Sequence, residues 1–195
     1  MSIKFVILGY LSWQPMTGYD VKKIIANSET LPWSANNNQI YRALVQLHND
    51  QWVTKTIEHQ VGSPDRHIYA ITEAGGQALR EWVQSTPEAP LTKKPFLHQL
   101  LWADCLPPED LDDLLAAYLN EVGTKLFFIR VQADRRPDMP QRTPREKQLW
   151  DSIYQNWIAH YDLELQWVRH LRQELQELAA EQQRAAARQK RLAQA

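Results

Sequence analysis

Cysteine is almost absent from the 195-residue sequence, since Cys105 is the single one, and an intramolecular disulfide is therefore excluded. The N-terminus lacks the basic stretch, apolar run and small-residue cleavage site of a secretory signal. The longest uninterrupted apolar stretches, such as residues 5–8, fall far short of the ~20 residues that a membrane-spanning helix requires. We therefore expect a cytoplasmic protein that does not contact a membrane.

Glycine is scarce as well, with 6 residues, whereas tryptophan is abundant, with 8. This balance favours long helices that pack through broad aromatic surfaces, and it argues against an antiparallel β-sandwich. Basic and acidic residues number 22 and 23, and 44% of the residues are hydrophobic, so the composition is that of a globular protein rather than a disordered chain. The length allows one domain or two small ones.

Catalytic and metal-binding motifs are missing too. The 6 histidines show no H-E-x-x-H spacing, and the sequence contains no Cys-x-x-Cys, Walker loop, G-x-G-x-x-G or G-x-S-x-G. An acidic cluster at residues 109–113 follows Pro107 and Pro108, where a helix start explains it better than a metal site, because the helix dipole favours negative charge there. We therefore expect no enzymatic activity, no metal and no cofactor.

The first 85 residues predict three helices, a β-hairpin and a fourth helix. Pro15 ends the first helix, Thr17 and Thr72 are suitable N-caps, and a Gly-Ser-Pro-Asp turn at residues 62–65 joins two β-branched and aromatic runs. The helices are expected at residues 3–13, 17–27, about 37–50 and about 73–85, and the strands at 52–57 and 66–71.

Periodicity also predicts which faces of these helices point inward. In the third helix the inward residues are Ile40, Ala43, Leu44 and Leu47. In the second helix they are Tyr19, Val21, Ile24 and Ile25. In the fourth helix, Gly75 and Gly76 are expected to weaken the first turn relative to alanine.

Residues 86–95 contain three prolines and no apolar period, which is typical of a linker. A helix should run from about Pro108 to Ala133, and a last helix should begin near Thr143. After Leu178 the chain is rich in alanine, glutamine and arginine, with a net charge of +3, which predicts a frayed helical or disordered tail. We thus expect domains at residues 1–85 and 96–178, a linker at 86–95 and a basic tail at 179–195.

The last helix carries a heptad seam interrupted by one acid, Glu164. The seam consists of Trp150, Tyr154, Trp157, Tyr161, Glu164, Val168, Leu171, Leu175 and Leu178. Further apolar residues lie beside it, so one side should pack within the chain and the other on a second subunit. The flanking residues are Leu149, Ile153, Leu163 and Trp167. The residues expected to mediate dimerisation are Tyr154, Trp157, Tyr161, Val168, Leu171 and Leu175.

A helix pair followed by a third helix and a hairpin is the order of a winged helix-turn-helix, whose third helix enters the major groove of DNA. Asparagine and glutamine can pair bidentately with adenine, and arginine can reach guanine or phosphate. The asparagine run can instead be a helix cap, and Tyr41 can either pack or donate to a phosphate. The candidate DNA-binding residues are Asn36, Asn37, Asn38, Gln39, Tyr41, Arg42, Lys22, Lys55, Arg66 and His67.

The charge count limits how this half of the chain can bind DNA. Residues 1–86 contain 7 cations and 7 anions, so nonspecific affinity, which depends on neutralising phosphates, should be weak for one subunit. Two subunits would have to bind together. The alternative is that the winged helix is a protein–protein interaction module that does not bind DNA.

Three segments resemble signature segments of the PadR family of transcriptional regulators, namely residues 7–23, 40–44 and 69–75. Residues 95–178 are similar in layout to the helical C-terminal domain of the longer members, which include virulence activators. The resemblance implies a homodimer that binds an inverted repeat in double-stranded DNA and is often relieved by a small molecule such as a phenolic acid. By position, Tyr41 matches the family's recognition-helix tyrosine, and Arg66 falls in the basic stretch of the wing.

The sequence departs from this family at two places, because asparagines occupy 36–38 where serine and glycine are frequent, and Gln51-Trp52 replaces a common Gly-Leu. The tryptophans beyond the linker either pack between subunits or line a pocket for an aromatic effector, for which the candidates are Trp102, Trp150 and Trp157. The expected fold is mainly α, with an N-terminal winged helix-turn-helix that has a two-stranded wing, and a C-terminal helical dimerisation domain. The expected function is that of a DNA-binding repressor.

Overall fold

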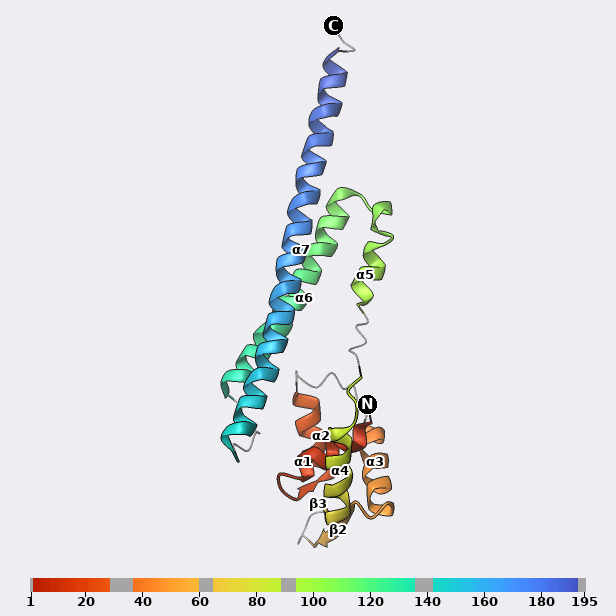
Figure 1. Cartoon of the computed structure of the whole chain (residues 1–195). Coiled ribbons are helices and arrows are strands. Elements are labelled where there is room, and N and C mark those ends of the chain that lie inside the picture. Colours follow the sequence, from red (N-terminus) through yellow and green to blue (C-terminus); the bar gives the residue numbers. More distant parts are fainter. Residues whose placement is uncertain (1, 29–36, 60–64, 89–93, 136–141, 193–195) are drawn as a thin grey trace. The chain divides into compact units, whose positions relative to one another are not determined.

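The computed structural model describes residues 2–28, 37–59, 65–88, 94–135 and 142–192, and these form two compact units (Figure 1). The elements of the N-terminal unit are α1 Ile3–Leu11, β1 Met16–Thr17, α2 Gly18–Asn27, α3 Asn37–Asn49, β2 Val53–Glu58, β3 Arg66–Ile71 and α4 Glu73–Gln84. Those of the helical unit are α5 Pro95–Leu100, a 3₁₀ turn at Ala103–Cys105, α6 Pro108–Arg135 and α7 Pro144–Leu192. The order confirms the mainly α class and the winged helix-turn-helix.

The predicted caps explain where α2 and α4 begin. The Thr17 hydroxyl accepts a hydrogen bond from the Asp20 amide at 3.1 Å, and the Asp20 carboxylate accepts one from the Thr17 amide, so α2 starts with a capping box. The Thr72 hydroxyl accepts from the Gly75 amide at 3.0 Å. Each cap provides a partner for amides that the helix itself leaves without an acceptor.

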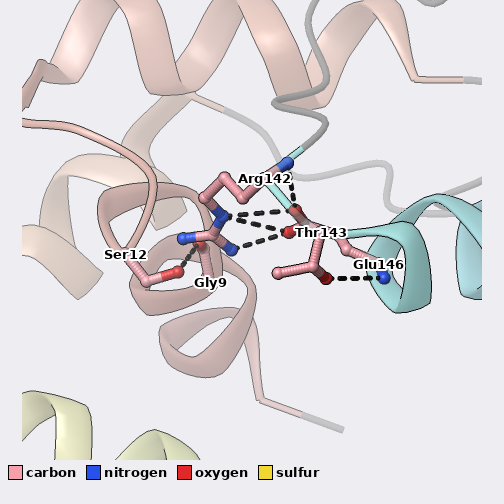
Figure 2. A network of polar contacts seen from close by, with 5 residues as sticks. All are labelled: Gly9, Ser12, Arg142, Thr143 and Glu146. Atoms are coloured by element: carbon pink, nitrogen blue, oxygen red, sulfur yellow. Dashed lines mark hydrogen bonds and ion pairs between the residues drawn. The ribbon is translucent and has the colours of Figure 1, made fainter.

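Side chains also close the end of α1 and the start of α7, as Figure 2 shows for each helix. At the end of α1, the Ser12 hydroxyl donates to the Gly9 carbonyl oxygen at 2.6 Å. At the start of α7, the Thr143 hydroxyl accepts from the Glu146 amide at 3.0 Å. The Arg142 guanidinium donates to the Glu146 carboxylate at 2.7 Å, and these hydrogen bonds lower the pKa of Glu146. The last helix therefore begins at Pro144, directly after Thr143 and close to the predicted start.

The core of the N-terminal unit is built on the inward face of α3. The four residues predicted for that face, Ile40, Ala43, Leu44 and Leu47, are all buried. They pack with buried residues of α1 that include Ile7, Leu8 and Leu11. Burying one large aliphatic side chain stabilises a fold by about 1.5–3 kcal/mol, so this packing holds α3 firmly and leaves its opposite face to solvent.

The wing belongs to a three-stranded sheet rather than to a hairpin alone. The strand order is β1-β3-β2, and both pairings are antiparallel. The additional strand β1 pairs Met16 with Tyr69 and Thr17 with Ile68. Two residues are too few to show the alternation by which strands are recognised in a sequence, so the expectation of a two-stranded wing missed β1.

The chain leaves α3 through a Schellman motif. The Trp52 amide donates to the Leu47 carbonyl oxygen at 2.9 Å, and the Gln51 amide donates to the His48 carbonyl oxygen at 3.0 Å. Gln51 has a φ of 59°, in the left-handed region where glycine is favoured. The replacement of glycine noted in the sequence therefore falls on the one described non-glycine residue that has a positive φ.

Gly75 allows α4 to touch this turn. The Thr72 amide donates to the Trp52 carbonyl oxygen at 3.0 Å, and the Thr72 hydroxyl donates to the Gln51 carbonyl oxygen at 2.8 Å. A Cβ atom on Gly75 would lie 2.1 Å from the Trp52 carbonyl oxygen. Helix propensity describes Gly75 as a weakness of α4, whereas packing makes a glycine necessary at this position.

The helical unit is centred on α6 and α7, which run side by side (Figure 1). One apolar cluster joins Phe96 of α5, Leu115 of α6 and Val168 of α7. A second cluster consists of the buried residues Val122, Leu126 and Leu165. Between the two long helices, the Arg172 guanidinium donates two hydrogen bonds of 2.6 Å to the Asp112 carboxylate.

The heptad seam of α7 packs within its own chain. Tyr154 and Val168 are 4% and 0% exposed. Three further seam residues are partly buried and pack against the apolar clusters, namely Tyr161, Leu171 and Leu175. The helical unit itself buries Tyr154 and Val168 and partly covers Tyr161, Leu171 and Leu175, and their role in dimerisation stays a prediction. Trp157 is partly buried and stacks on Tyr161 with ring centroids 6.0 Å apart, so its role in dimerisation stays a prediction.

Beyond Leu178 the chain continues as a helix, and α7 extends to Leu192. The expectation of a frayed or disordered tail is corrected by this result, and the physical reason is that alanine, glutamine and arginine are strong helix formers. Among the described residues, no helix combines the length and the hydrophobicity that crossing a membrane requires.

Candidate nucleic-acid interface

The face of α3 opposite the core carries the side chains predicted to read DNA. Those that the structure describes are exposed, namely Asn38, Gln39, Tyr41 and Arg42. Asn37 is the first residue of α3, and Asn36 lies outside the described residues. An α-helix with its side chains is about 10–12 Å across, and the major groove is about 12 Å wide, so a helix with this polar face can enter the groove.

Tyr41 packs on one side and is open to solvent on the other. A Cβ atom on Gly18 would lie 2.7 Å from Cε1 of the Tyr41 ring, so the ring rests on the first residue of α2. Nearby, burial raises the pKa of Tyr69, and the proximity of Tyr41 raises it further. The two roles considered for Tyr41, packing and presenting a hydroxyl, are thus compatible.

The second helix, α2, contributes an exposed aromatic residue that the sequence interpretation missed. Tyr19, predicted to point inward, is 63% exposed. That prediction is wrong because Tyr19 lies about 160° around the helix from the buried Val21 and about 120° from the buried Ile25, at 100° per residue. Lys23 shares its face and is exposed, whereas the predicted Lys22 is partly buried. A helical projection with Val21 on the buried face would have placed Tyr19 on the exposed face.

The predicted wing residues lie on both faces of the hairpin. Lys55 pairs with Tyr69 in the register, and His67 pairs with Ile57, so Lys55 and His67 share the face that carries Tyr69. Arg66 pairs with Glu58 on the other face. Lys55, Arg66 and His67 are all exposed. The face shared by Lys55 and His67 is the better candidate for phosphate contact, because Arg66 lies directly opposite an acid.

Two of the tryptophans predicted for an effector pocket lie near different parts of α7. Trp102 is 77% exposed, and the next residue, Ala103, lines a groove together with Leu175 of α7. Trp150 precedes Leu175 by 25 residues, which is about 38 Å along a helix. Trp102 and Trp150 are therefore far apart within one chain, and a pocket that combines them with Trp157 stays a prediction.

Glu164, the acid in the seam, is the centre of a buried polar network. It is 7% exposed, its carboxylate accepts a hydrogen bond from the Tyr118 hydroxyl at 2.8 Å, and it forms an ion pair with Lys94. Burial alone would raise the pKa of Glu164, but the hydrogen bonds from Lys94 and Tyr118 and the charge of Lys94 lower it. The pKa of Tyr118 is raised by burial and by Glu164. The network fastens the start of α5 and the middle of α6 to α7.

An open depression of about 850 Å³ adjoins this network. It is lined by Lys94, Leu97, His98, Leu100, Leu101 and His160. Three nitrogen-bearing side chains therefore border an apolar wall. This combination suits a small molecule that has an apolar body and a negatively charged group.

One face of α7 remains exposed although it is apolar, and we call it the α7 apolar stripe. Its residues are Leu149, Ile153, Leu163 and Trp167, all of them exposed. At 100° per residue they lie within about 40° of a common direction on the helix. These are the residues predicted to flank the seam, and the structure leaves them uncovered.

A unit in which α3 presents polar side chains beside an antiparallel wing defines a winged helix-turn-helix protein, the class to which many transcriptional regulators belong. Residues 7–81 match the model of the Transcriptional regulator PadR-like family. The N-terminal unit is therefore similar to this family of transcriptional regulators, over the segments whose resemblance the sequence indicated.

A curated relative and several solved structures resemble the chain. The chain is 27% identical over 125 residues to the negative transcriptional regulator PadR of Bacillus subtilis, an alignment that covers 64% of this chain and 69% of the relative. Structures of that PadR, in complex with operator DNA and with p-coumaric acid, match with TM-scores of 0.75 and 0.72 at 21% and 20% identity. Each match covers 89% of this chain and 98% of the other.

A further structural match is the virulence activator AphA of Vibrio cholerae, with a TM-score of 0.65 and 23% identity. This match covers 91% of this chain and 99% of the AphA chain. At these identities the structural matches show that the fold is shared across both units.

Proposed function

We propose that the protein is a sequence-specific DNA-binding repressor that acts as a homodimer on an inverted-repeat operator. The observation that carries this proposal is the division of α3 into a fully buried apolar face and an exposed polar face. A helix held by its core face and polar on its outer face is suited to reading base edges. The exposed side chains of Tyr19 and Tyr41 carry hydroxyls that suit phosphate oxygens, which receive half or more of the hydrogen bonds in protein–DNA interfaces.

A homodimer is supported by charge and by surface. The N-terminal unit gains no net attraction to phosphates from its 7 cations and 7 anions, so tight binding requires two recognition helices acting together. The α7 apolar stripe offers a surface through which two copies can associate, since an exposed apolar row of this kind is costly in water. Two subunits related by a twofold axis would present their recognition helices to half-sites about one turn of DNA apart.

The proposed sign of regulation is negative. The relative PadR of Bacillus subtilis is a negative regulator, and its structures contain operator DNA in one case and p-coumaric acid in another. By analogy, a small aromatic effector would relieve repression here. The depression lined by Lys94, His98 and His160 is the site we propose for it, because the apolar wall suits a ring and the basic side chains suit an acid group.

The test begins with selection of duplexes from a random library by the purified full-length protein, followed by a gel-shift assay on the enriched duplex. We expect an inverted repeat whose retention falls steeply with salt. The variants Tyr41→Ala and Asn38→Ala should each weaken binding by about 1–3 kcal/mol. As a control, Gln77→Ala changes an exposed polar residue of α4 and should leave affinity unchanged.

The competing function is a protein–protein interaction module, which is favoured by the neutral charge of the N-terminal unit. The same assay separates the two functions. Absence of retention at low salt, for every duplex in the library, would exclude the DNA-binding proposal and favour the interaction module.

A further inference from the structure

The last turns of α7 carry a row of arginines, and no other described part of the chain packs against them. We call it the α7 arginine stripe and define it as Arg184, Arg188 and Arg191. All three side chains are exposed, as is every residue from 181 to 189. At 100° per residue, the spacing of four and then three places the arginines on one face of the helix, about 6 Å and 4.5 Å apart along its axis.

These arginines differ from the other cations of the helical unit, several of which have acidic partners. Arg130 pairs with Asp162 at 2.8 Å, and Lys147 pairs with Asp151 at 3.0 Å. Arg172 pairs with Asp112 at 2.6 Å. Within the described residues, no ion pair involves any arginine of the stripe. Glu181 is the single acid in residues 179–195, whereas that segment has four cations.

The stripe is also unfavourable for the isolated helix. Like charges four residues apart, such as Arg184 and Arg188, destabilise a helix by a few tenths of a kcal/mol. A cation in the last turn, such as Arg191, is favoured by the helix dipole, but that effect falls off within one turn and does not account for Arg184. An external polyanion would remove the repulsion and would make use of the whole row.

The distribution of charge indicates which polyanion this is. The N-terminal unit is neutral over residues 1–86, and residues 87–178 carry 11 cations and 15 anions, so the excess of positive charge is confined to the segment after Leu178. The net positive charge of the chain is therefore located at the end of α7. We infer that the α7 arginine stripe is a second DNA-contacting surface, which binds phosphates of the duplex that flanks the operator.

This inference rests on the proposed DNA binding and deepens it. The stripe contacts backbone without reading sequence, because arginines on a single exposed helix face reach phosphates in any sequence. Alanines at 185–187 keep the helix narrow between the arginines and do not obstruct close approach. Each phosphate neutralised adds about 0.9 to the slope of log affinity against log salt, so three contacts contribute about 2.7 per chain.

The experiment compares three full-length triple variants on the selected duplex with long flanks and on the same duplex trimmed to the operator. Arg184→Gln, Arg188→Gln and Arg191→Gln together should reduce the salt slope on the long duplex by about 2.7 per chain, which is roughly a 40-fold difference in salt sensitivity between 50 and 200 mM. On the trimmed duplex this variant should equal the wild type. Changing the same three residues to lysine should preserve the slope.

The matched control removes the same charge elsewhere in the helical unit, through Arg135→Gln, Arg145→Gln and Arg169→Gln, all at exposed positions. Circular dichroism checks that α7 remains helical in each variant. Equal slopes for the stripe variant and this control would overturn the inference, and the stripe would then serve an acidic protein or an anionic membrane. If the wild type binds no duplex at all, the proposed function itself fails, and the two failures are thus distinguished.

Discussion

Gly75 offers the sharpest test of how the N-terminal unit is packed. The substitution Gly75→Ala would place a Cβ atom 2.1 Å from the Trp52 carbonyl oxygen and 2.9 Å from its carbonyl carbon. Contacts below 3.0 Å essentially never occur for real Cβ atoms, so α4 or the turn after α3 must move by about 1 Å. The Trp52 carbonyl oxygen also accepts the 3.0 Å hydrogen bond from the Thr72 amide, which this movement would strain.

The expected magnitude follows from these contacts. Overpacking costs about 1–3 kcal/mol, and a strained hydrogen bond costs about 1 kcal/mol. Alanine recovers up to about 1 kcal/mol through helix propensity. The free energy of unfolding of the N-terminal unit should therefore fall by about 2 kcal/mol in Gly75→Ala. Urea unfolding of the full chain, followed by far-ultraviolet circular dichroism, measures this as a lower midpoint at an unchanged slope.

The neighbouring glycine is a matched control. A Cβ atom on Gly76 would meet Arg80 Nη1 at 3.6 Å, an ordinary contact, so Gly76→Ala should stabilise the unit by about 0.5–1 kcal/mol. Gly75→Ala should thus lower the free energy of unfolding and Gly76→Ala should raise it, so the two variants should differ by about 3 kcal/mol. If Gly75→Ala proved as stable as Gly76→Ala, the close approach of α4 to the Trp52 backbone would be refuted.

Three further predictions concern the turn, the buried acid and the exposed stripe. Gln51→Gly should raise the free energy of unfolding by about 0.5–1 kcal/mol, because glycine adopts a φ of 59° without strain; a lower urea midpoint would contradict this. The lowered pKa of Glu164 means that its carboxylate stabilises the folded state above its ordinary pKa of 4.5, and that this stabilisation is lost as pH falls through the lowered value. Glu164→Gln should therefore destabilise the helical unit at pH 7 and flatten the loss of stability between about pH 5 and 3 in thermal melts; an unchanged pH profile would exclude the role. Leu163→Glu should convert dimer to monomer in sedimentation equilibrium without lowering the melting temperature of the monomer, and an intact dimer would show that another face is used.

The helices of the N-terminal unit could be predicted because their signals are local. A hydroxyl cap such as Thr17, a proline after the first helix and the four-residue inward face of α3 each depend on residues within one or two turns. The short strand β1 could not be predicted, since Met16 and Thr17 become a strand only by pairing with β3. Tyr19 was misplaced because it was grouped by residue type with Val21, Ile24 and Ile25, although it shares a helix face with the exposed Lys23.

The sequence predicted which residue types could contact DNA, but it did not predict which of them share a face. Composition and order predicted that α3 is the recognition helix, and the structure leaves its described outer residues exposed. The register of β2 and β3 decided that Lys55 and His67 share a face that Arg66 does not. Register depends on pairing between strands, so no pattern within either strand alone could reveal it.

The sequence by itself determined the periodic elements of this protein, because hydrophobic spacing, caps and turns act over a few residues and do not depend on a distant partner. It could not decide which of two apolar rows on α7 would be covered, since both rows have helical spacing. The tertiary structure decided this, because α6 packs on the seam around Val168 and leaves Leu163 and Trp167 exposed. The same packing turned Glu164 from an interruption of a heptad pattern into the buried partner of Lys94 and Tyr118, and that pairing requires three segments distant in sequence to meet.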